Sequence, residues 1–65
     1  MQILLNGEET HITADTLAAL ISELGLEKRM IAIERNLEVV PKSEYESTML
    51  SEHDRIELVH MIGGG

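Results

Sequence analysis

The stretch of the chain whose residue types point to chemistry is its end, which consists of three glycines, Gly63, Gly64 and Gly65. Glycines usually mark a turn between two elements, but no element follows these three. Because glycine lacks a Cβ atom, such a segment is thin and conformationally permissive, and it can enter a channel too narrow for side chains. It also carries an α-carboxylate that can be inserted deep into the active site of another protein. The alternative is a frayed end without a role, which is common for termini.

Large apolar residues directly precede the glycines. Residues 55–62 alternate between polar and apolar types, which predicts a final strand with Ile56 and Leu58 on the core face. Glu57, Val59 and Met61 take the opposite face. A frayed end seldom carries large apolar residues, and flexible methionine suits an adaptable binding surface.

No other constellation in the sequence forms an active site. The three histidines, His11, His53 and His60, share no metal-ligand spacing, and the chain contains no cysteine. No serine lies in a nucleophile-elbow pattern, and no glycine-rich loop precedes a helix to hold a phosphate. The acidic residues are spread along positions expected to face solvent. The sequence therefore predicts that any catalysis takes place on a partner, and that the chain itself is not an enzyme and holds no metal.

The bulk properties of the 65 residues are those of one small folded domain. The sequence is 43% hydrophobic, and no apolar run approaches the roughly 20 residues of a membrane span. The net charge of −7 disfavours binding to nucleic acid and favours steering toward a basic partner surface, although it also serves solubility. The N-terminus lacks the pattern of a signal peptide. We therefore expect a cytoplasmic protein that contacts no membrane and is a monomer when free.

The first twelve residues predict a β-hairpin. Asn6-Gly7 follows an apolar run, and this dipeptide favours a type I′ turn because both central residues need positive φ. A two-residue loop there gives a register of three pairs, Leu5 with Glu8, Ile3 with Thr10 and Met1 with Ile12. Met1, Ile3, Leu5 and Ile12 should then face the core, with the second strand at the edge of the sheet.

Residues 13–25 predict the main helix. Apolar residues recur at i, i+3, i+4 and i+7, which places four of them on one face: Leu17, Leu20, Ile21 and Leu24. Either Thr13 or Asp15 is expected to cap its start, and Gly25 supplies a left-handed residue at its end.

Short elements fill the region between the helix and the final strand. Residues 30–35 and 37–40 read as strands joined by a tight turn at Asn36, and Pro41 ends the second of them. A capping-box pattern over 43–46 predicts one helical turn that begins at Ser43. Tyr45, the single aromatic residue, is expected to pack beneath this segment, and residues 51–54 form a polar turn.

This order of elements predicts an α+β fold. A helix that connects two strand pairs should lie over one face of a single twisted sheet. We expect a roll with a mixed sheet of four to five strands, one main helix packed on one face, and the last strand beside the first. Residues 1–62 form the domain, and residues 63–65 form a flexible glycine tail.

Taken together, these features resemble the sulfur carrier proteins of the ubiquitin-like (β-grasp) superfamily, and most closely its thiamine-thiazole branch, the ThiS family. The resemblance runs through Met1-Gln2-Ile3 with Asn6-Gly7, Thr16-Leu17 with Leu20-Ile21 and Leu24-Gly25, Ile33-Glu34-Arg35-Asn36, Val40-Pro41-Lys42-Ser43 with Tyr45, and Asp54-Arg55-Ile56-Glu57-Leu58-Val59-His60 before the three glycines. The last of these runs is the most specific. Leu37 and His53 stand where the family usually has glycine, so a left-handed backbone at either position would be strained.

The resemblance implies a reaction cycle for the tail. An adenylating, E1-like enzyme transfers AMP from ATP to the Gly65 carboxylate, and sulfur delivered as a persulfide by a cysteine desulfurase displaces the AMP. Gly65 then carries a thiocarboxylate, from which thiazole synthase takes the sulfur. On this view the chain binds no cofactor of its own, Gly63 and Gly64 extend the tail, and Val59, Met61 and Ile62 form the docking surface for the partner enzymes.

Several other readings share these residues. A carrier for molybdopterin, cysteine or methionine synthesis would have the same fold and tail chemistry. A ubiquitin-like modifier would form isopeptide bonds to lysines of other proteins, and a non-covalent binding module would keep its binding after Gly64 and Gly65 are deleted.

Overall fold

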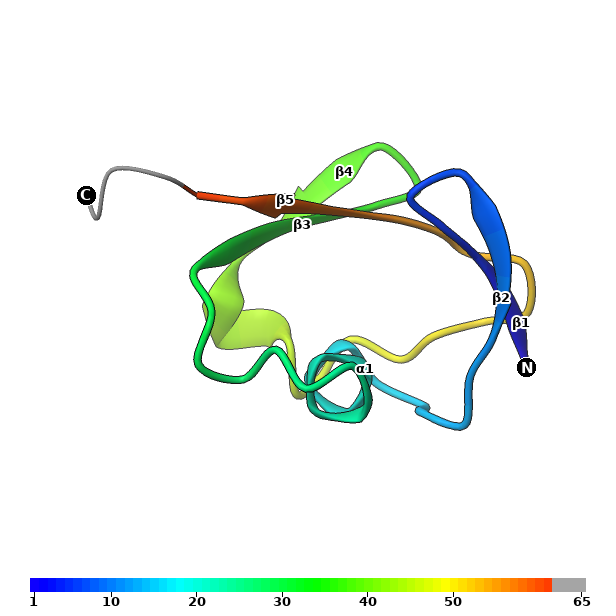
Figure 1. The fold of residues 1–65 in the computed structure, drawn as a ribbon, viewed down its shortest axis with the longest axis horizontal. Helices are drawn as coiled ribbons and strands as arrows, with labels where there is room; N and C mark the ends of the chain where they lie inside the picture. Colours follow the sequence, from blue (N-terminus) through cyan, green and yellow to red (C-terminus); the bar gives the residue numbers. More distant parts are fainter. Residues whose placement is uncertain (62–65) are drawn as a thin grey trace.

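The computed structural model describes residues 1–61 of the chain. Its elements, in chain order, are β1 (Gln2–Leu5), β2 (Glu8–His11), α1 (Leu17–Glu23), β3 (Ile31–Arg35), β4 (Glu38–Val40), the 3-10 turn η1 (Lys42–Glu44) and β5 (Arg55–His60). The strands form one mixed sheet in the order β2-β1-β5-β3-β4, with α1 beneath one face (Figure 1). The predicted roll, with the last strand beside the first, is therefore confirmed.

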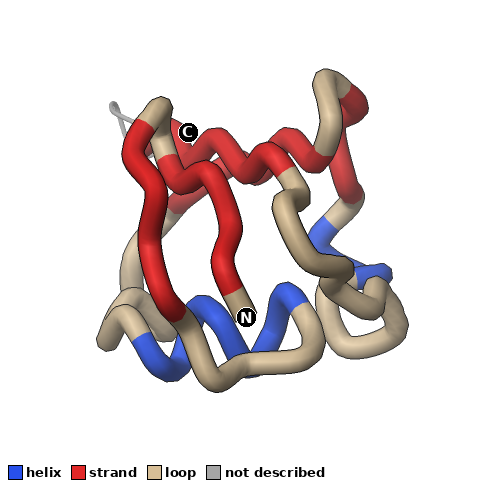
Figure 2. The backbone as a smooth tube through the Cα atoms, turned by 90° about the vertical axis from the view of Figure 1, so that its right-hand side faces the viewer, coloured by secondary structure: helices blue, strands red, loops and turns tan. Residues whose placement is uncertain are grey.

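The N-terminal hairpin has the predicted register. Asn6 and Gly7 have φ angles of 49° and 84°, as a type I′ turn requires, and the β1–β2 pairs include Ile3 with Thr10. The ladder continues one step further, because the Ile12 N–H donates to the Met1 carbonyl at 2.9 Å and the Met1 ammonium donates back at 2.8 Å. In Figure 2 the hairpin stands as two neighbouring strands at one edge of the molecule.

The main helix is shorter than predicted and has a different cap. It begins at Leu17, and Thr16 is the N-cap, since its hydroxyl accepts from the Ala19 N–H at 3.1 Å. The prediction of Thr13 or Asp15 as the cap was wrong because the helix begins at Leu17, which places Thr16 at the N-cap position. The Thr13 hydroxyl donates to the Glu23 carboxylate at 3.0 Å, and the Asp15 carbonyl accepts from Leu50.

The predicted helix face meets the sheet. Leu17 and Leu20 are fully buried, and Ile21 and Leu24 pack against the core while remaining partly exposed. The core lies between α1 and the inner face of the sheet, and its residues with less than 2% exposure are Ile3, Ile12, Leu17, Leu20, Ile33 and Ile56. Gly25 has a φ of 72°, as predicted for the left-handed residue after the helix.

Two boundaries in the second half differ from the prediction. β4 begins at Glu38, because Leu37 belongs to the turn with Asn36 and both have positive φ. The capping box at Ser43 does not form. Instead the 3-10 turn begins at Lys42 after Pro41, which offers no side-chain cap. Tyr45 is 8% exposed and belongs to the core, as expected.

The two positions at which the resemblance implies glycine both have left-handed backbones. Leu37 has a φ of 74° and His53 a φ of 69°. For a residue with a Cβ atom this conformation is strained, because Cβ crowds the neighbouring carbonyl oxygen. Both side chains are exposed, so burial of the side chain does not offset the strain.

β5 follows the predicted alternation but ends at His60, two residues before the predicted end. Ile56 is fully buried, and Leu58 packs against the core. None of the helices in residues 1–61 is long and apolar enough to cross a membrane.

Candidate functional site: the end of the last strand

The strand that leads to the terminal glycines lies in the middle of the sheet. β1 pairs with it in parallel at Arg55 and Ile56, and β3 pairs with it antiparallel from Ile56, opposite Arg35, to His60, opposite Ile31. A strand held by neighbours on both sides at its start provides a rigid base for whatever follows its end.

The start of β5 is fixed by a buried carboxylate. Asp54 is 6% exposed, and its Oδ2 atom accepts from Arg35 Nε at 2.9 Å and from the Ser51 N–H at 2.8 Å. Its Oδ1 atom accepts from Asn36 Nδ2 at 3.1 Å. Asn36 in turn accepts from the Arg55 N–H at 2.9 Å and donates its own N–H to the Arg55 carbonyl at 2.8 Å. We call these five residues, Arg35, Asn36, Ser51, Asp54 and Arg55, the Asp54 cluster.

These contacts also determine the charge state of Asp54. Burial by itself would raise the pKa of its carboxyl group, but the Ser51 N–H and the Asn36 and Arg35 side chains together hold that pKa below its usual value. The carboxylate is therefore ionised near neutral pH. It connects the turn between β3 and β4, which contains Asn36, to the turn before β5, which contains Ser51.

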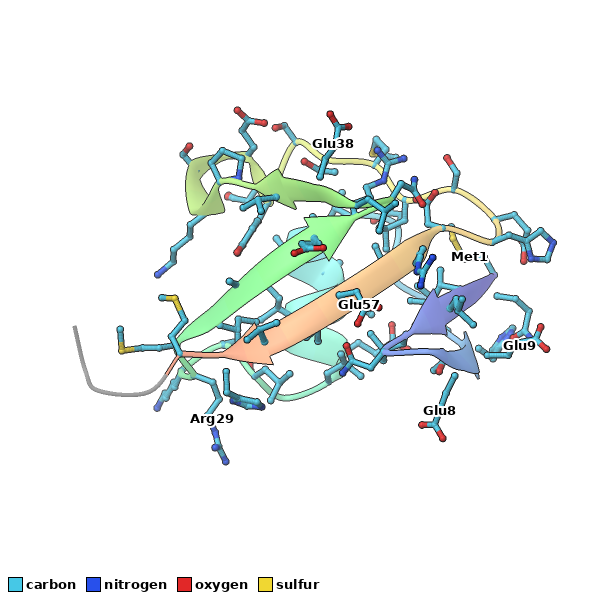
Figure 3. All side chains as sticks on the ribbon, turned by 90° about the horizontal axis from the view of Figure 1, so that it is seen from above. Met1, Glu8, Glu9, Arg29, Glu38 and Glu57 are labelled. Carbon is cyan, nitrogen blue, oxygen red and sulfur yellow. The ribbon has the colours of Figure 1, made fainter. Side chains whose placement is uncertain are left out.

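The end of β5 has fewer neighbours. β1 stops pairing after Ile56, and the Leu58 N–H donates instead to the Asn6 side chain at 2.7 Å. Beyond that point β3 is the only strand of residues 1–61 that pairs with β5, and the last described bond runs from the Met61 N–H to the Met30 carbonyl at 2.9 Å. In Figures 1 and 3 this end of β5 lies at the opposite end of the molecule from Met1.

One edge of the strand is left open there. Backbone groups two residues apart on a strand point to the same side, so the His60 N–H points the same way as the Leu58 N–H, away from β3. Within residues 1–61 no strand pairs with that side of β5 after Ile56. The backbone next to the tail can therefore hydrogen-bond to an added chain.

The structure describes two of the three predicted docking residues. Val59 lies opposite Ala32 on the outer face of the sheet and is 55% exposed. Met61 is 51% exposed and lies past the end of β5, where it lines a hollow together with residues of α1 and η1. The two residues thus flank the end of the strand and do not form one continuous face. Ile62, Gly63, Gly64 and Gly65 lie outside the described residues.

The outer face of the sheet is mainly polar around the middle of β5. Glu57, labelled in Figure 3, lies opposite Glu34 on β3, and the one ion pair that it makes within residues 1–61 is with Arg55, at 3.9 Å between Nε and Oε1. Two facing carboxylates with one exposed arginine leave this part of the face acidic, which suits a basic partner surface.

The histidines do not come together. His11 lies on β2, His53 in the turn before β5 and His60 at the end of β5. Among residues 1–61 no group of three or more histidines, aspartates and glutamates is placed to hold a metal ion.

Two features of this region were missed from the sequence. The sequence predicts only a polar turn at Asp54, although the arginine and asparagine that bind it stand together at positions 35 and 36, at the end of a predicted strand. Met30 and Lys42, which line the hollow with Met61, carry no sequence signal of their own because they come from separate segments.

The fold and this site together define a class. A five-stranded mixed sheet over one helix, in which the central last strand leads into the terminal glycines, is the β-grasp arrangement. A family model described as the ThiS family matches residues 3–65. The chain therefore belongs to the ThiS family, as the sequence resemblance indicated.

Individual relatives agree with this assignment. The chain is 36% identical to the sulfur carrier protein ThiS of Bacillus subtilis, over 94% of this chain and 96% of that protein. The crystal structure of a thiamine biosynthesis protein (ThiS) from Geobacter metallireducens matches with a TM-score of 0.85 at 25% identity, over the full length of both chains.

Another relative is a much longer protein. A thiazole synthase of Paramagnetospirillum magneticum is 47% identical over the whole of this chain, yet the match spans only 20% of that protein. A second thiazole synthase, from Magnetococcus marinus, is 46% identical over the whole of this chain, and the match again spans 20% of that protein. The chain thus spans about a fifth of the length of these two relatives.

Proposed function

We propose that this protein is a sulfur carrier for the thiazole ring of thiamine. In this proposal the Gly65 carboxylate is adenylated, converted to a thiocarboxylate and presented to thiazole synthase. The observation that carries the proposal is the family match from residue 3 to residue 65, because it includes the strand, the residues after it and all three glycines. The 36% identity to the sulfur carrier of Bacillus subtilis over nearly the whole of both chains supports the same function.

The longer relatives favour thiazole synthase as the acceptor. Proteins named thiazole synthase contain a segment almost half identical to this entire chain. A carrier-like segment within the same polypeptide as the synthase supports a direct transfer between the two. This favours the thiazole pathway over molybdopterin, cysteine or methionine synthesis.

The chemistry of the terminal carboxylate explains why activation comes first. A free α-carboxyl group has a pKa of about 3.3–3.7, so it is ionised at neutral pH and is a poor electrophile. Transfer of AMP from ATP releases pyrophosphate and gives a mixed anhydride, whose carbonyl carbon a persulfide sulfur can attack with AMP as the leaving group. Cleavage of the sulfur–sulfur bond by a thiol then leaves the thiocarboxylate on Gly65.

The described part of the chain is suited to hold such a tail for other enzymes. β5 is anchored at its start by the Asp54 cluster and ends in exposed apolar residues, Val59 and Met61, next to an open strand edge. These residues can contact the enzyme while the glycines enter its active site, since glycines need the least width. The acidic outer face around Glu57 supports approach to a basic surface.

The direct test is intact-protein mass spectrometry. The chain is incubated with ATP, its adenylating enzyme, a cysteine desulfurase with cysteine, and a thiol reductant. We expect a mass gain equal to one oxygen replaced by one sulfur, assigned to Gly65 by fragmentation. The sulfurated chain, mixed with thiazole synthase and its other substrates, should lose this gain as thiazole forms.

Two variants serve as controls. Deletion of Gly64 and Gly65 should abolish the mass gain while the circular dichroism spectrum is unchanged, because both residues follow the folded domain. Gly65→Ala should impair activation without unfolding. An unchanged mass of the wild-type chain, with an adenylating enzyme that is active on another carrier, would overturn the proposal. Covalent conjugates to lysines of other proteins would instead assign the tail to a protein modifier.

A further inference from the structure

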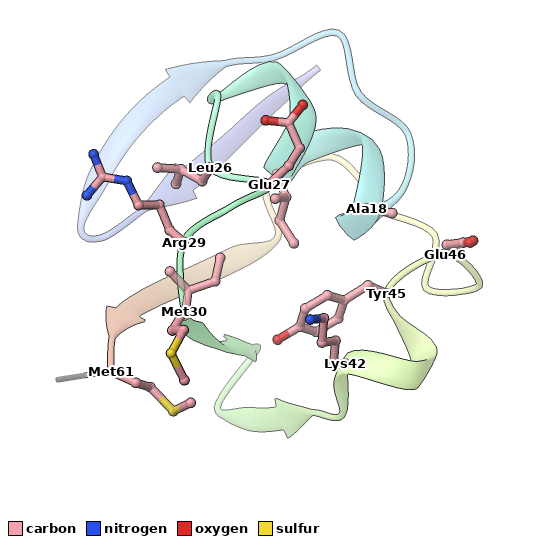
Figure 4. A pocket seen from close by; sticks show the side chains of 11 residues that line it. Ala18, Leu26, Glu27, Arg29, Met30, Lys42, Tyr45, Glu46 and Met61 are labelled. Carbon is pink, nitrogen blue, oxygen red and sulfur yellow. The ribbon is translucent and has the colours of Figure 1, made fainter. Parts of the chain in front are cut away.

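A hollow lies at the base of the tail, on the side of the sheet that carries the helix. Its volume is about 480 Å³, within the range of about 300–1,000 Å³ usual for ligand pockets. Its apolar lining comes from α1, the loop after it with the first residue of β3, the residue after η1 and the residue after β5 (Figure 4), and it includes Ile21, Leu26, Met30, Ile31, Tyr45 and Met61. Four separate segments thus converge on an apolar space that no part of residues 1–61 fills.

The charges around the hollow leave one cation available. Glu27 accepts a hydrogen bond from the Ser22 hydroxyl at 3.1 Å, and Glu46 points away from the hollow in Figure 4, as does the guanidinium of Arg29. Lys42 stands at the mouth beside Tyr45. The ion pairs within residues 1–61 use Arg35 and Arg55, so Lys42 has no carboxylate partner there. Lys42 is therefore a cation at the mouth that the carboxylate of a partner can pair with.

We propose that this hollow receives an apolar side chain of the adenylating enzyme, flanked in that enzyme by a carboxylate that pairs with Lys42. The inference rests on the proposed function, since it names a docking point of the enzyme that takes up the tail. Met61 lines the hollow and is separated from the first tail glycine by one residue. Any enzyme that encloses the glycines therefore comes into contact range of the hollow.

The walls of the hollow suit an induced fit to one anchoring side chain. Met30 is 47% exposed and Met61 51% exposed, and the Met61 N–H to Met30 carbonyl bond holds the two residues together. Methionine side chains are unbranched and adapt to the shape of a partner. An apolar anchor that fills a pocket is the usual pattern of a binding hot spot. The carboxylate beside the anchor distinguishes this contact from the basic surface expected to face Glu57.

The test measures steady-state formation of pyrophosphate by the adenylating enzyme with wild-type chain and two variants of the hollow, Lys42→Glu and Met30→Asp. Both side chains are exposed, so both variants should fold. We expect each to raise KM for the carrier about tenfold while kcat stays within twofold, because a hot-spot contact contributes to binding and not to the chemical step.

Matched controls carry the same changes outside the hollow. Lys28→Glu reverses a charge on the same loop, and Met49→Asp replaces a methionine that is 59% exposed; neither residue lines the hollow. Both should keep KM within twofold of wild type. Equal KM values for the hollow variants and the controls would overturn the inference while leaving the proposed function intact. A wild-type chain that is not adenylated at all would overturn both.

Two other occupants give distinct results. If a second copy of this chain filled the hollow, sedimentation would detect a dimer, and the Lys42→Glu substitution would dissociate it. If the chain's own last four residues filled the hollow, deletion of residues 62–65 would shift the amide resonances of Met30 and Tyr45 in the NMR spectrum. Either result would overturn the inference, because the hollow would then be filled before the enzyme arrives.

Discussion

The two ends of β5 differ in how their polar and apolar groups are used. At its start, the buried Asp54 carboxylate accepts three hydrogen bonds, and within residues 1–61 every buried side-chain polar atom has a partner. At its end, Val59 and Met61 are more than half exposed, and the backbone edge beside His60 is open. The same strand thus has its buried polar groups fully hydrogen-bonded at its start, whereas at its end it has exposed apolar side chains and an unpaired backbone edge.

This difference separates stability from function along a single element. Buried, fully hydrogen-bonded groups are costly to disturb, whereas exposed apolar residues contribute little to folding and leave surface for a partner. The comparison predicts that substitutions at the start of β5 change the free energy of unfolding. Substitutions at its end should instead change the adenylation of the tail by the partner enzyme. Each prediction below tests one side of this separation.

The largest effect is expected for Asp54→Ala. The substitution removes three hydrogen bonds and leaves the partly buried Arg35 without its ion pair, so we expect a loss of about 3 kcal/mol in the free energy of unfolding. A domain of this size is stable by only about 3–10 kcal/mol, so this loss is a large fraction of the total. Urea unfolding followed by circular dichroism measures it.

The control for this substitution is Glu9→Ala, which removes the same charge from an exposed position on β2. It should change the free energy of unfolding by less than about 0.5 kcal/mol. If Asp54→Ala were as stable as Glu9→Ala, the Asp54 cluster would not stabilise the start of β5 and the comparison would fail.

Acid should weaken the start of β5. The pKa of Asp54 is lower in the folded chain than its usual value of about 3.9, so its stabilising contribution is fully present above that value and is lost as the pH falls through the folded pKa. Hydrogen bonds from the Thr13 and Ala14 N–H groups and the Thr13 hydroxyl lower the pKa of Glu23 as well, with the Thr13 N–H as the main cause.

The measurement is the urea midpoint from pH 7 down to pH 2.5, for wild type and for Asp54→Asn. The asparagine cannot titrate, so the variant should start from a lower stability and lose less of it below about pH 4. Parallel curves for the two proteins would show that Asp54 does not contribute to the acid sensitivity.

The features predictable from the sequence are those that neighbouring residues decide. Asn6-Gly7 determines the hairpin register because the turn type needs positive φ at two adjacent positions, and both residues have it. The helix face follows from spacing, and Leu17 and Leu20 are fully buried as predicted. The tail was found for the same reason, since three adjacent glycines are visible in the sequence itself.

The features that the sequence did not reveal depend on distant contacts. Thr13, Asp15 and Thr16 all suit an N-cap. In the fold the Thr13 hydroxyl binds Glu23, and the Asp15 backbone carbonyl accepts from Leu50 in the segment before the helix, so the first residue available as the cap is Thr16. The same holds for the site. Asp54 meets Arg35 across 19 positions, and the hollow collects residues from 18 to 61, so only the folded chain brings them together.

A smaller effect, of opposite sign, is expected at the two strained turns. Leu37→Gly and His53→Gly each relieve a left-handed φ, and we expect each to raise the free energy of unfolding by about 0.5–1 kcal/mol after the greater freedom of glycine in the unfolded chain is subtracted. Leu37 is 71% exposed, so losing its side chain costs little burial.

Leu37→Ala is the control for this pair, because alanine keeps the Cβ atom and therefore the strain. Its free energy of unfolding, measured with urea, should not rise above that of the wild type. Both glycine variants should accept sulfur on Gly65 at the wild-type rate, since neither turn lies at the end of β5. A glycine variant no more stable than Leu37→Ala would show that the backbone strain at that turn is negligible.

The smallest effect on stability is expected for Met61→Ser, at the other end of the strand. The side chain is 51% exposed and lies past the last residue of β5, so the free energy of unfolding should change by less than about 0.5 kcal/mol. Adenylation by the partner enzyme should nevertheless weaken, because serine removes an adaptable apolar contact beside the tail. Met49→Ser, at a methionine of similar exposure away from the tail, should change neither quantity. If Met61→Ser lowered stability by more than about 1 kcal/mol, the end of β5 would belong to the folding core. The separation between the two ends of the strand would then not hold.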